Sequence, residues 1–133
     1  MLVTIEKVLL LKQMPLFKTV SNMALSDLMS FSEEQTFKAG DVLINKDSQN
    51  QAIYFLLSGR VEKADATKKE LINAKAIIGL DSVFWIAPAS QQVVAVQKTV
   101  VLKVPQDKLY RMMALHPSLA TAVLNGLSEL IHT

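Results

Sequence analysis

Apolar residues recur at helical spacing near both ends of the 133-residue chain and in short strand-like runs in its middle. Residues 4–12 alternate apolar and charged positions in a way that predicts a short amphipathic helix, and Pro15 ends it. A second helix is predicted from Ser21, a favourable N-cap residue. Its apolar face would carry Ala24, Leu25, Leu28, Met29 and Phe31.

Between residues 34 and 104 the runs are shorter, with period-two character and polar or glycine-containing breaks, which predicts strands. We expect strands near 34–37, 42–44, 53–58, 60–64, 71–72, 76–78, 92–96 and 99–104. Residues 65–70 are predicted to be a hairpin loop, and the last two strands are expected to pair around a tight turn at 97–98. Gly40 is expected to take a positive φ in the turn before Val42. The fold class predicted is mainly β: an eight-stranded antiparallel roll, jelly-roll-like (a double-stranded β-helix), with flanking helices.

Residues 105–133 return to helical spacing and predict two C-terminal helices. Pro105 opens this region, and His116-Pro117 marks a break within it. The last helix has a stripe of apolar residues that is wider than one packing face needs. The members of this stripe are Leu119, Ala120, Val123, Leu124, Leu127, Leu130 and Ile131.

Composition narrows the class of protein without naming a function. A length of 133 residues fits one domain over 1–133, with helices in 1–31, a roll in 34–104 and helices in 105–133. The net charge of +2 is too small to argue for a nucleic-acid or membrane surface. The chain has no cysteine, and its apolar runs are shorter than the roughly 18 to 20 residues that cross a bilayer. These properties are compatible with the cytoplasm.

Catalysis and metal binding are not expected. The two histidines, His116 and His132, have no His, Asp or Glu partner at metal-ligand spacing in the sequence. The chain contains no nucleophile elbow, Walker loop or zinc pattern. We therefore expect no enzyme activity.

The stretch from Gly79 to Ala95 joins two strand-like runs by something other than a simple turn. A single helical turn is predicted for 80–84, and a loop through Pro88 follows it. Free backbone N–H groups at the start of a helix suit an anion, so the connection has the form of a pocket. Phe84 and Trp85 either stack on a base or plug the open end of the roll, and we favour the second.

Several segments in order resemble the cyclic nucleotide-binding domain family, which includes the catabolite activator protein and the regulatory subunits of protein kinase A. The segments are Pro15-Leu16-Phe17, Phe37 with Gly40-Asp41-Val42-Leu43-Ile44, and Ile53 to Val61. The resemblance covers roughly Leu9 to Ile131. In the loop after Ile44, Asp47, Ser48 and Asn50 stand where the family usually has Gly, Asp and Gly. Asp and Asn tolerate left-handed backbone, so we expect that loop to form.

The family's phosphate-binding cassette, matched here by residues 79–92, begins Gly-Glu and runs through eight variable positions ending in Pro to an Arg. Gly79 and Pro88 fit this pattern without a gap. Leu80 stands where the family has the glutamate that holds the ribose hydroxyl, and Ala89 where it has the arginine that grips the cyclic phosphate. The resemblance implies a degenerate cassette that lacks its two strongest polar contacts.

The cassette supplies all the candidate ligand-binding residues: Gly79, Leu80, Asp81, Ser82, Ala89, Ser90, Gln91 and Gln92. Ser90 either has the role of the family position that touches the phosphate or is an ordinary loop serine, and we favour the second. Gln91 and Gln92 either donate amide hydrogens to a ligand or form a solvated strand start, and Asp81 can cap the short helix. Whether Lys75 or Arg60 replaces the missing cation stays open.

The resemblance implies a non-enzymatic regulatory or interaction domain with weak or no cyclic nucleotide binding and no cofactor. The alternative is a sensor of a cyclic nucleotide or another small molecule. The partners expected are an attached or separate effector domain and a second copy bound through the last helix. The family's transcription factors append a helix-turn-helix after this point and this chain ends at Thr133, so we expect no DNA binding and no membrane insertion.

Overall fold

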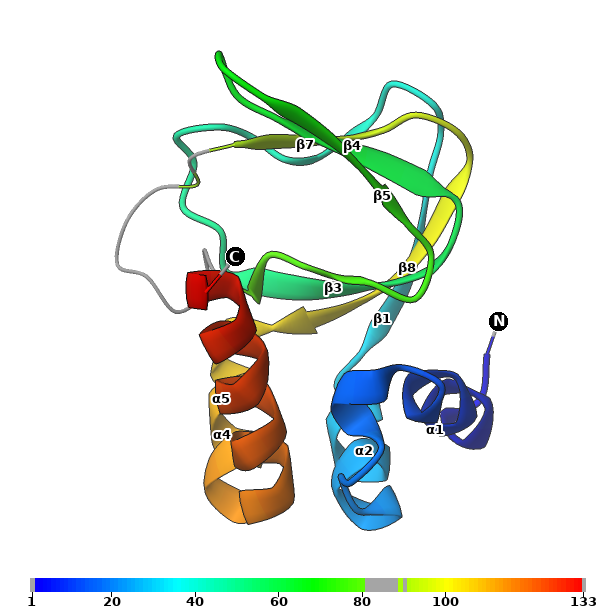
Figure 1. The fold of residues 1–133 in the computed structure, drawn as a ribbon. Coiled ribbons are helices and arrows are strands. Elements are labelled where there is room, and N and C mark those ends of the chain that lie inside the picture. Colours follow the sequence, from blue (N-terminus) through cyan, green and yellow to red (C-terminus); the bar gives the residue numbers. More distant parts are fainter. Residues whose placement is uncertain (1, 81–88, 90, 133) are drawn as a thin grey trace. The chain divides into compact units, whose positions relative to one another are not determined.

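The computed structural model describes residues 2–80, 89 and 91–132, with side chains to residue 128. The chain divides into two compact units, a helical unit of Met1–Glu33 with Val104–Thr133 and a β unit of Glu34–Lys103 (Figure 1). A single domain over residues 1–133 stays a prediction. In the described part of the chain every helix is too short or too polar to cross a bilayer.

The helical unit contains α1 (Thr4–Lys12), the 3-10 helix η1 (Pro15–Phe17), α2 (Asn22–Met29), α4 (Gln106–Leu115) and α5 (Pro117–His132). Ser21 is the N-cap of α2, as predicted, and its Oγ accepts a hydrogen bond from the Ala24 N–H at 3.1 Å. Helix α2 packs against α1, α4 and α5. Its buried residues are Ala24, Leu25, Leu28 and Met29, whereas Phe31 follows the end of the helix.

The break predicted at His116-Pro117 is confirmed. His116 leaves the helical region with φ −128° and ψ 97°, and its carbonyl accepts from Leu119 N–H and Ala120 N–H in the first turn of α5. Its Nε2 lies 2.8 Å from the Asp27 Oδ2 of α2. This pair joins the junction of α4 and α5 to α2, and it could not be predicted from local sequence because the two residues are 89 positions apart.

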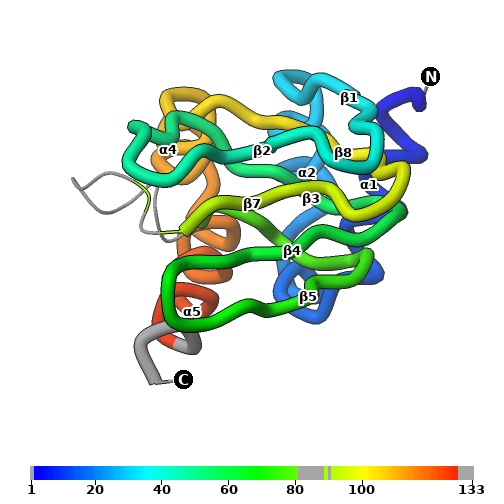
Figure 2. Tube along the Cα trace, turned by 90° about the horizontal axis from the view of Figure 1, so that it is seen from above, coloured from blue at the N-terminus to red at the C-terminus, as the bar shows by residue number. Residues whose placement is uncertain are grey.

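The β unit has eight strands in two four-stranded sheets, which confirms the predicted fold class. The strands are β1 (Glu33–Phe37), β2 (Val42–Ile44), β3 (Ala52–Ser58), β4 (Arg60–Ala64), β5 (Lys69–Asn73), β6 (Ile77–Ile78), β7 (Gln92–Ala95) and β8 (Thr99–Pro105). One sheet has the order β1-β8-β3-β6 and the other β2-β7-β4-β5. The second sheet is seen from above in Figure 2.

Two local predictions about strand connections are wrong. β7 and β8 do not pair around residues 97–98, because β7 lies between β2 and β4 while β8 lies between β1 and β3. The chain changes sheets there instead of turning back. The β4–β5 loop is also shorter than predicted: Ala64 is the register partner of Lys69, so Lys69 and Glu70 belong to β5.

The chain passes from one sheet to the other at two corners, one at Gly59 between β3 and β4 and one at residues 96–99 between β7 and β8. The two corners pack against each other. Thr99 Oγ1 accepts from the Arg60 N–H at 3.3 Å and donates to the Arg60 carbonyl at 3.2 Å. Gly59 has φ +96°, and a Cβ on it would lie 2.5 Å from the Lys98 carbonyl oxygen. Only glycine fits this corner, because the second corner occupies the space that a side chain needs.

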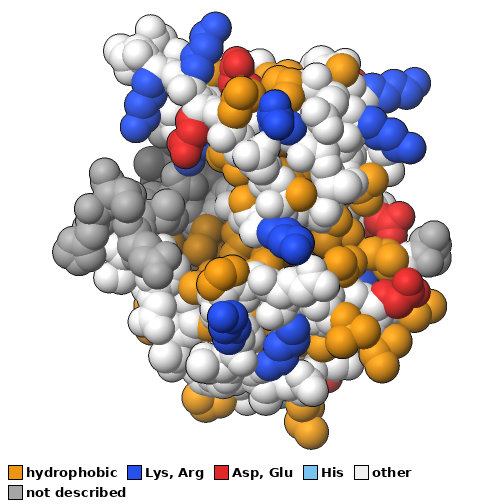
Figure 3. Space-filling model, turned by 45° about the vertical axis from the view of Figure 1, so that its right-hand side comes forward, with side chains coloured by type: hydrophobic (Ala, Val, Ile, Leu, Met, Phe, Trp, Pro, Cys, Tyr) orange, Lys and Arg blue, Asp and Glu red, His pale blue; other side chains and the backbone are white. Residues whose placement is uncertain are grey.

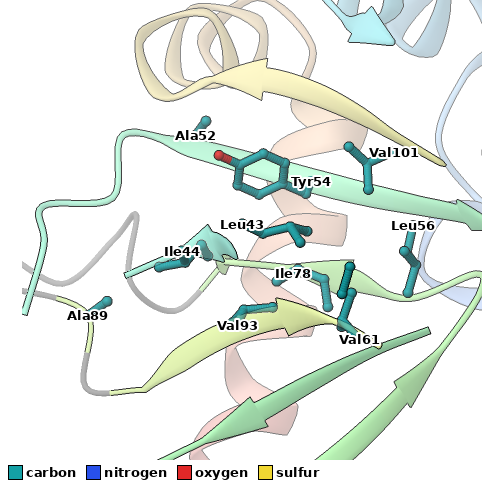
Figure 4. Close-up of a cluster of buried hydrophobic side chains, with 11 residues drawn as sticks. Leu43, Ile44, Ala52, Tyr54, Leu56, Val61, Ile78, Ala89, Val93 and Val101 are labelled. Carbon is teal, nitrogen blue, oxygen red and sulfur yellow. The ribbon is translucent and has the colours of Figure 1, made fainter. Parts of the chain in front are cut away.

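The two sheets enclose a cluster of apolar side chains (Figure 4). Strand residues alternate between faces, so Val61, Val93 and Ala95 point inward and their neighbours point outward. Ala89 belongs to the same cluster. The full cluster is Leu43, Ile44, Ala52, Tyr54, Leu56, Val61, Ile78, Ala89, Val93, Ala95 and Val101.

Candidate functional site

Gly79 begins the candidate cassette directly after β6, with φ +90°. A Cβ at this position would lie 2.7 Å from Asn50 Nδ2 and 3.1 Å from the Ala52 carbonyl oxygen. A glycine is therefore required here by the approach of two other chain segments and by the positive φ. This requirement exists with or without a ligand.

Asn50 is the buried polar side chain that connects the loop after β2 to the start of the cassette. Its Nδ2 donates to the Gly79 carbonyl at 3.4 Å, and its Oδ1 accepts from the Ala52 N–H at 3.3 Å. A buried amide side chain is costly unless it is bonded, so these bonds fix the loop against Gly79. The left-handed residue of this loop is Asp47, with φ +68°, in line with the expectation that the loop tolerates the missing glycine.

Ala89, at the family's arginine position, has both backbone groups bonded to the same loop. Its N–H donates to the Ser48 carbonyl at 2.9 Å, and its carbonyl accepts from the Asp47 N–H at 2.8 Å. The residue is 4% exposed and its side chain joins the apolar cluster. The polypeptide is thus held at this position by main-chain bonds, and the side chain offers only a methyl group to the interior.

Leu80, at the family's glutamate position, is 6% exposed. Both positions that carry charge in the family are therefore apolar and buried here. Among the described residues, the only buried polar side chains are those of Asn50 and Thr99. Burial raises the pKa of Tyr54, whose ring lies in the cluster, so this phenol is neutral at physiological pH.

The two glutamines after the cassette lie at the junction with the β4–β5 hairpin. Gln91 Nε2 donates to Asp65 Oδ2 at 3.4 Å. Gln92 is exposed and is the register partner of Ala64, on the face of β7 opposite to Val93. Their role as ligand donors stays a prediction.

The remaining predicted site residues, Asp81, Ser82 and Ser90, lie outside the described residues. So do Phe84-Trp85 and the predicted helical turn after Leu80. Gly79, Leu80, Ala89, Gln91 and Gln92 are the predicted site residues that the structure places.

The two candidate replacement cations occupy other parts of the β unit. Arg60 lies at the Gly59 end of β4, where its Nε donates to Asn73 Oδ1 at 2.9 Å, whereas the cassette end of β4 is Ala64. Lys75 is exposed in the connection between β5 and β6. In the described part of the face shown in Figure 3, Lys and Arg side chains are scattered and form no continuous basic patch.

The described residues contain no group of three or more His, Cys, Asp or Glu placed to hold a metal ion. Within the described part of the helical unit, no nucleophilic side chain is hydrogen-bonded to the Asp27–His116 pair to complete a catalytic triad. Among the described residues, the surroundings of Gly79 and Ala89 are apolar side chains, the bonded amide of Asn50 and bonded main-chain groups. Their chemistry suits packing better than acid–base or nucleophilic catalysis.

Comparison with known proteins matches the chain to one protein family. The sequence model described as "Cyclic nucleotide-binding domain" matches residues 34–116. No curated protein matches the chain. Several solved structures share the fold of this chain.

The sensor domain of the transcriptional regulator DNR from Pseudomonas aeruginosa is 22% identical, with a TM-score of 0.83 over 97% of this chain and 91% of that one. A putative cyclic nucleotide-binding protein from Geobacter metallireducens GS-15 is 21% identical, with a TM-score of 0.82 over 98% and 96%. The Thermus thermophilus catabolite activator protein is 18% identical, with a TM-score of 0.77 over 89% of this chain and 58% of that one.

Proposed function

The chain belongs to the cyclic nucleotide-binding domain family, and on that premise we propose that it is a non-enzymatic regulatory or interaction domain with a degenerate cassette. Cyclic AMP and cyclic GMP are not its ligands in this proposal. The domain instead transmits or receives a signal through an attached or separate effector. The sensor domain of a transcriptional regulator is one of the proteins to which the chain is similar.

The observation that carries the proposal is the buried, apolar character of Leu80 and Ala89. An arginine at position 89 would make two charge-assisted hydrogen bonds to a phosphate, each contributing about 1.5 to 3 kcal/mol. Their loss is about 3 to 6 kcal/mol, which corresponds to roughly a hundredfold to ten-thousandfold in affinity. Leu80 adds to this loss because it leaves a ribose hydroxyl without its acceptor.

The last helix supports the proposed partner surface. Leu124 of α5 is 59% exposed, while Leu119, Ala122 and Val123 on the same helix are buried. The apolar residues of α5 thus extend beyond the face that packs within the helical unit. We propose that a second copy or the effector covers this face.

Isothermal titration calorimetry with cyclic AMP and cyclic GMP tests the proposal. No binding heat is expected from the natural chain, and low-micromolar binding of either nucleotide would support the alternative, a cyclic-nucleotide sensor. The double variant Leu80→Glu, Ala89→Arg is expected to gain binding. A matched double variant of similar size without charge, Leu80→Gln, Ala89→Met, should gain none. If the charged pair gains nothing while remaining folded, the cassette alignment is wrong.

A further inference from the structure

A hollow of about 300 Å³ lies on the sheet β2-β7-β4-β5, and it takes no part in the proposed function. Ala64 of β4 and Val94 of β7 form its floor. Its walls come from Lys46 after β2, Glu62 of β4, Asp65 at the start of the hairpin turn, and Gln92 of β7. The strands that carry these residues lie side by side in Figure 2.

This hollow is on the outer face of the sheet. Val61 and Ala95 are register partners and belong to the interior cluster. Because strand side chains alternate, the neighbouring pairs Glu62–Val94 and Ala64–Gln92 project to the opposite face. The hollow is therefore separated from the cassette interior by the thickness of the sheet.

Small floor residues create the hollow. Ala64 stands between Glu62 and the hairpin turn, where a larger side chain would fill the space over β7. The volume is at the lower end of the range for small-molecule sites, roughly 300 to 1,000 Å³. It suits a ligand of only a few heavy atoms.

The walls carry opposite charges that do not neutralise one another. Within the described residues, Lys46 and Glu62 form no ion pair or side-chain hydrogen bond. Asp65 is held in place: its Oδ1 accepts from the Thr67 N–H at 2.8 Å and from the Lys68 N–H at 2.9 Å. These backbone bonds lower its pKa to about 2, so it stays ionised.

We infer that this outer hollow binds a small zwitterion, with its carboxylate at Lys46 and its ammonium group at Glu62 and Asp65. Gln92 adds an amide that can donate to the carboxylate. A cation on one wall and carboxylates on the other match both ends of such a ligand, whereas a simple anion or cation would meet a like charge. Gln92 is also a candidate residue of the cassette, but the inference does not depend on cyclic nucleotide binding there.

The test is a two-dimensional ¹H–¹⁵N NMR titration of the full chain with glycine, β-alanine and 4-aminobutyrate. Two charge contacts at a partly exposed site correspond to a dissociation constant on the order of 30 mM, so each probe is added to about 200 mM at constant ionic strength. Saturable shifts are expected at residues 46, 62–66 and 92–94 with at least one probe. Acetate and methylammonium, which carry one charge each, are expected to bind severalfold more weakly than the zwitterions, up to about fivefold.

Variants identify the wall residues. Lys46→Met and Glu62→Gln should each weaken binding severalfold, up to about fivefold, because each removes one charged contact at a partly exposed site. Ala64→Leu should abolish binding by filling the floor. Lys38→Met, which removes an exposed cation from the β1–β2 turn, should leave it unchanged.

Three results would overturn the inference. They are no saturable shift with any of the three zwitterions, single-charge compounds that bind as tightly as the zwitterions, and Lys46→Met or Glu62→Gln variants that bind a zwitterion as tightly as the natural chain does. The amide spectrum of each variant shows at once whether it is folded. Cyclic nucleotide titrations do not bear on this outcome, so the cassette proposal and the zwitterion site stand or fall separately.

Discussion

The corner at Gly59 predicts an unusually costly glycine-to-alanine substitution. With φ +96°, an alanine at position 59 incurs about 1 to 3 kcal/mol of backbone strain. Its Cβ would also lie 2.5 Å from the Lys98 carbonyl oxygen, 2.5 Å from Thr99 Oγ1 and 2.6 Å from Thr99 Cα. Two of these atoms belong to the backbone, so relief requires one corner to move, at a further cost of about 1 to 3 kcal/mol. We expect Gly59→Ala to lower the free energy of unfolding by about 2 to 6 kcal/mol, which is the sum of the two contributions.

Gly40 is the matched control for this prediction. It has almost the same φ, +94°, but a Cβ added to it would meet no atom within 4 Å. Gly40→Ala should therefore show only the backbone strain, about 1 to 3 kcal/mol. Urea unfolding followed by far-UV circular dichroism gives both values. If the two variants are equally destabilised, the two corners do not pack as described and the steric argument fails.

Three further predictions concern single contacts. Asp65→Ala should lower the urea midpoint, and Asp65→Asn should keep most of the stability. The pKa of Asp65 is lowered from 3.8 to about 2, so the stabilisation by its carboxylate is present above pH 3.8 and is lost as the pH falls toward 2. Asp65→Asn should therefore flatten the acid limb of a stability–pH curve. Burial raises the pKa of Tyr54 above its ordinary 10.0, so stability should fall as pH rises above 10, and Tyr54→Phe should remove that fall. A double-mutant cycle with Asp27→Ala and His116→Ala should give a coupling of about 0.5 to 1 kcal/mol, and zero coupling would contradict the 2.8 Å pair.

Local sequence rules predicted the elements of this fold well. Ser21 as an N-cap, Gly40 with a positive φ, and the helix break at His116 each depend on residues close in the chain. The predicted pairing of β7 with β8 is wrong because it depends on contacts between residues far apart in the chain. A short connection between two strands normally makes a hairpin, and the contact of Thr99 with Arg60 that directs β8 to the other sheet spans 39 positions.

The candidate site shows the same limit. The resemblance identified Leu80 and Ala89 as departures from the family pattern, and the structure places both in the interior. The sequence did not predict that Asn50 would bond to Gly79, or that Ala89 would be fixed by Ser48, because these contacts join segments roughly 30 to 40 residues apart. The outer hollow was missed because it depends on which face of β4 each residue occupies.

The position of β8 between β1 and β3 has a consequence for how the chain acquires its structure. During synthesis, β1 emerges more than sixty residues before the strand that pairs with it, so β1 has no neighbour in its sheet until Thr99–Pro105 has left the ribosome. Pairing at such long sequence separation slows folding, since loop closure is completed before any contact compensates for it. A nascent chain halted before residue 99 should remain sensitive to protease in β1, and one released past residue 105 should become resistant there.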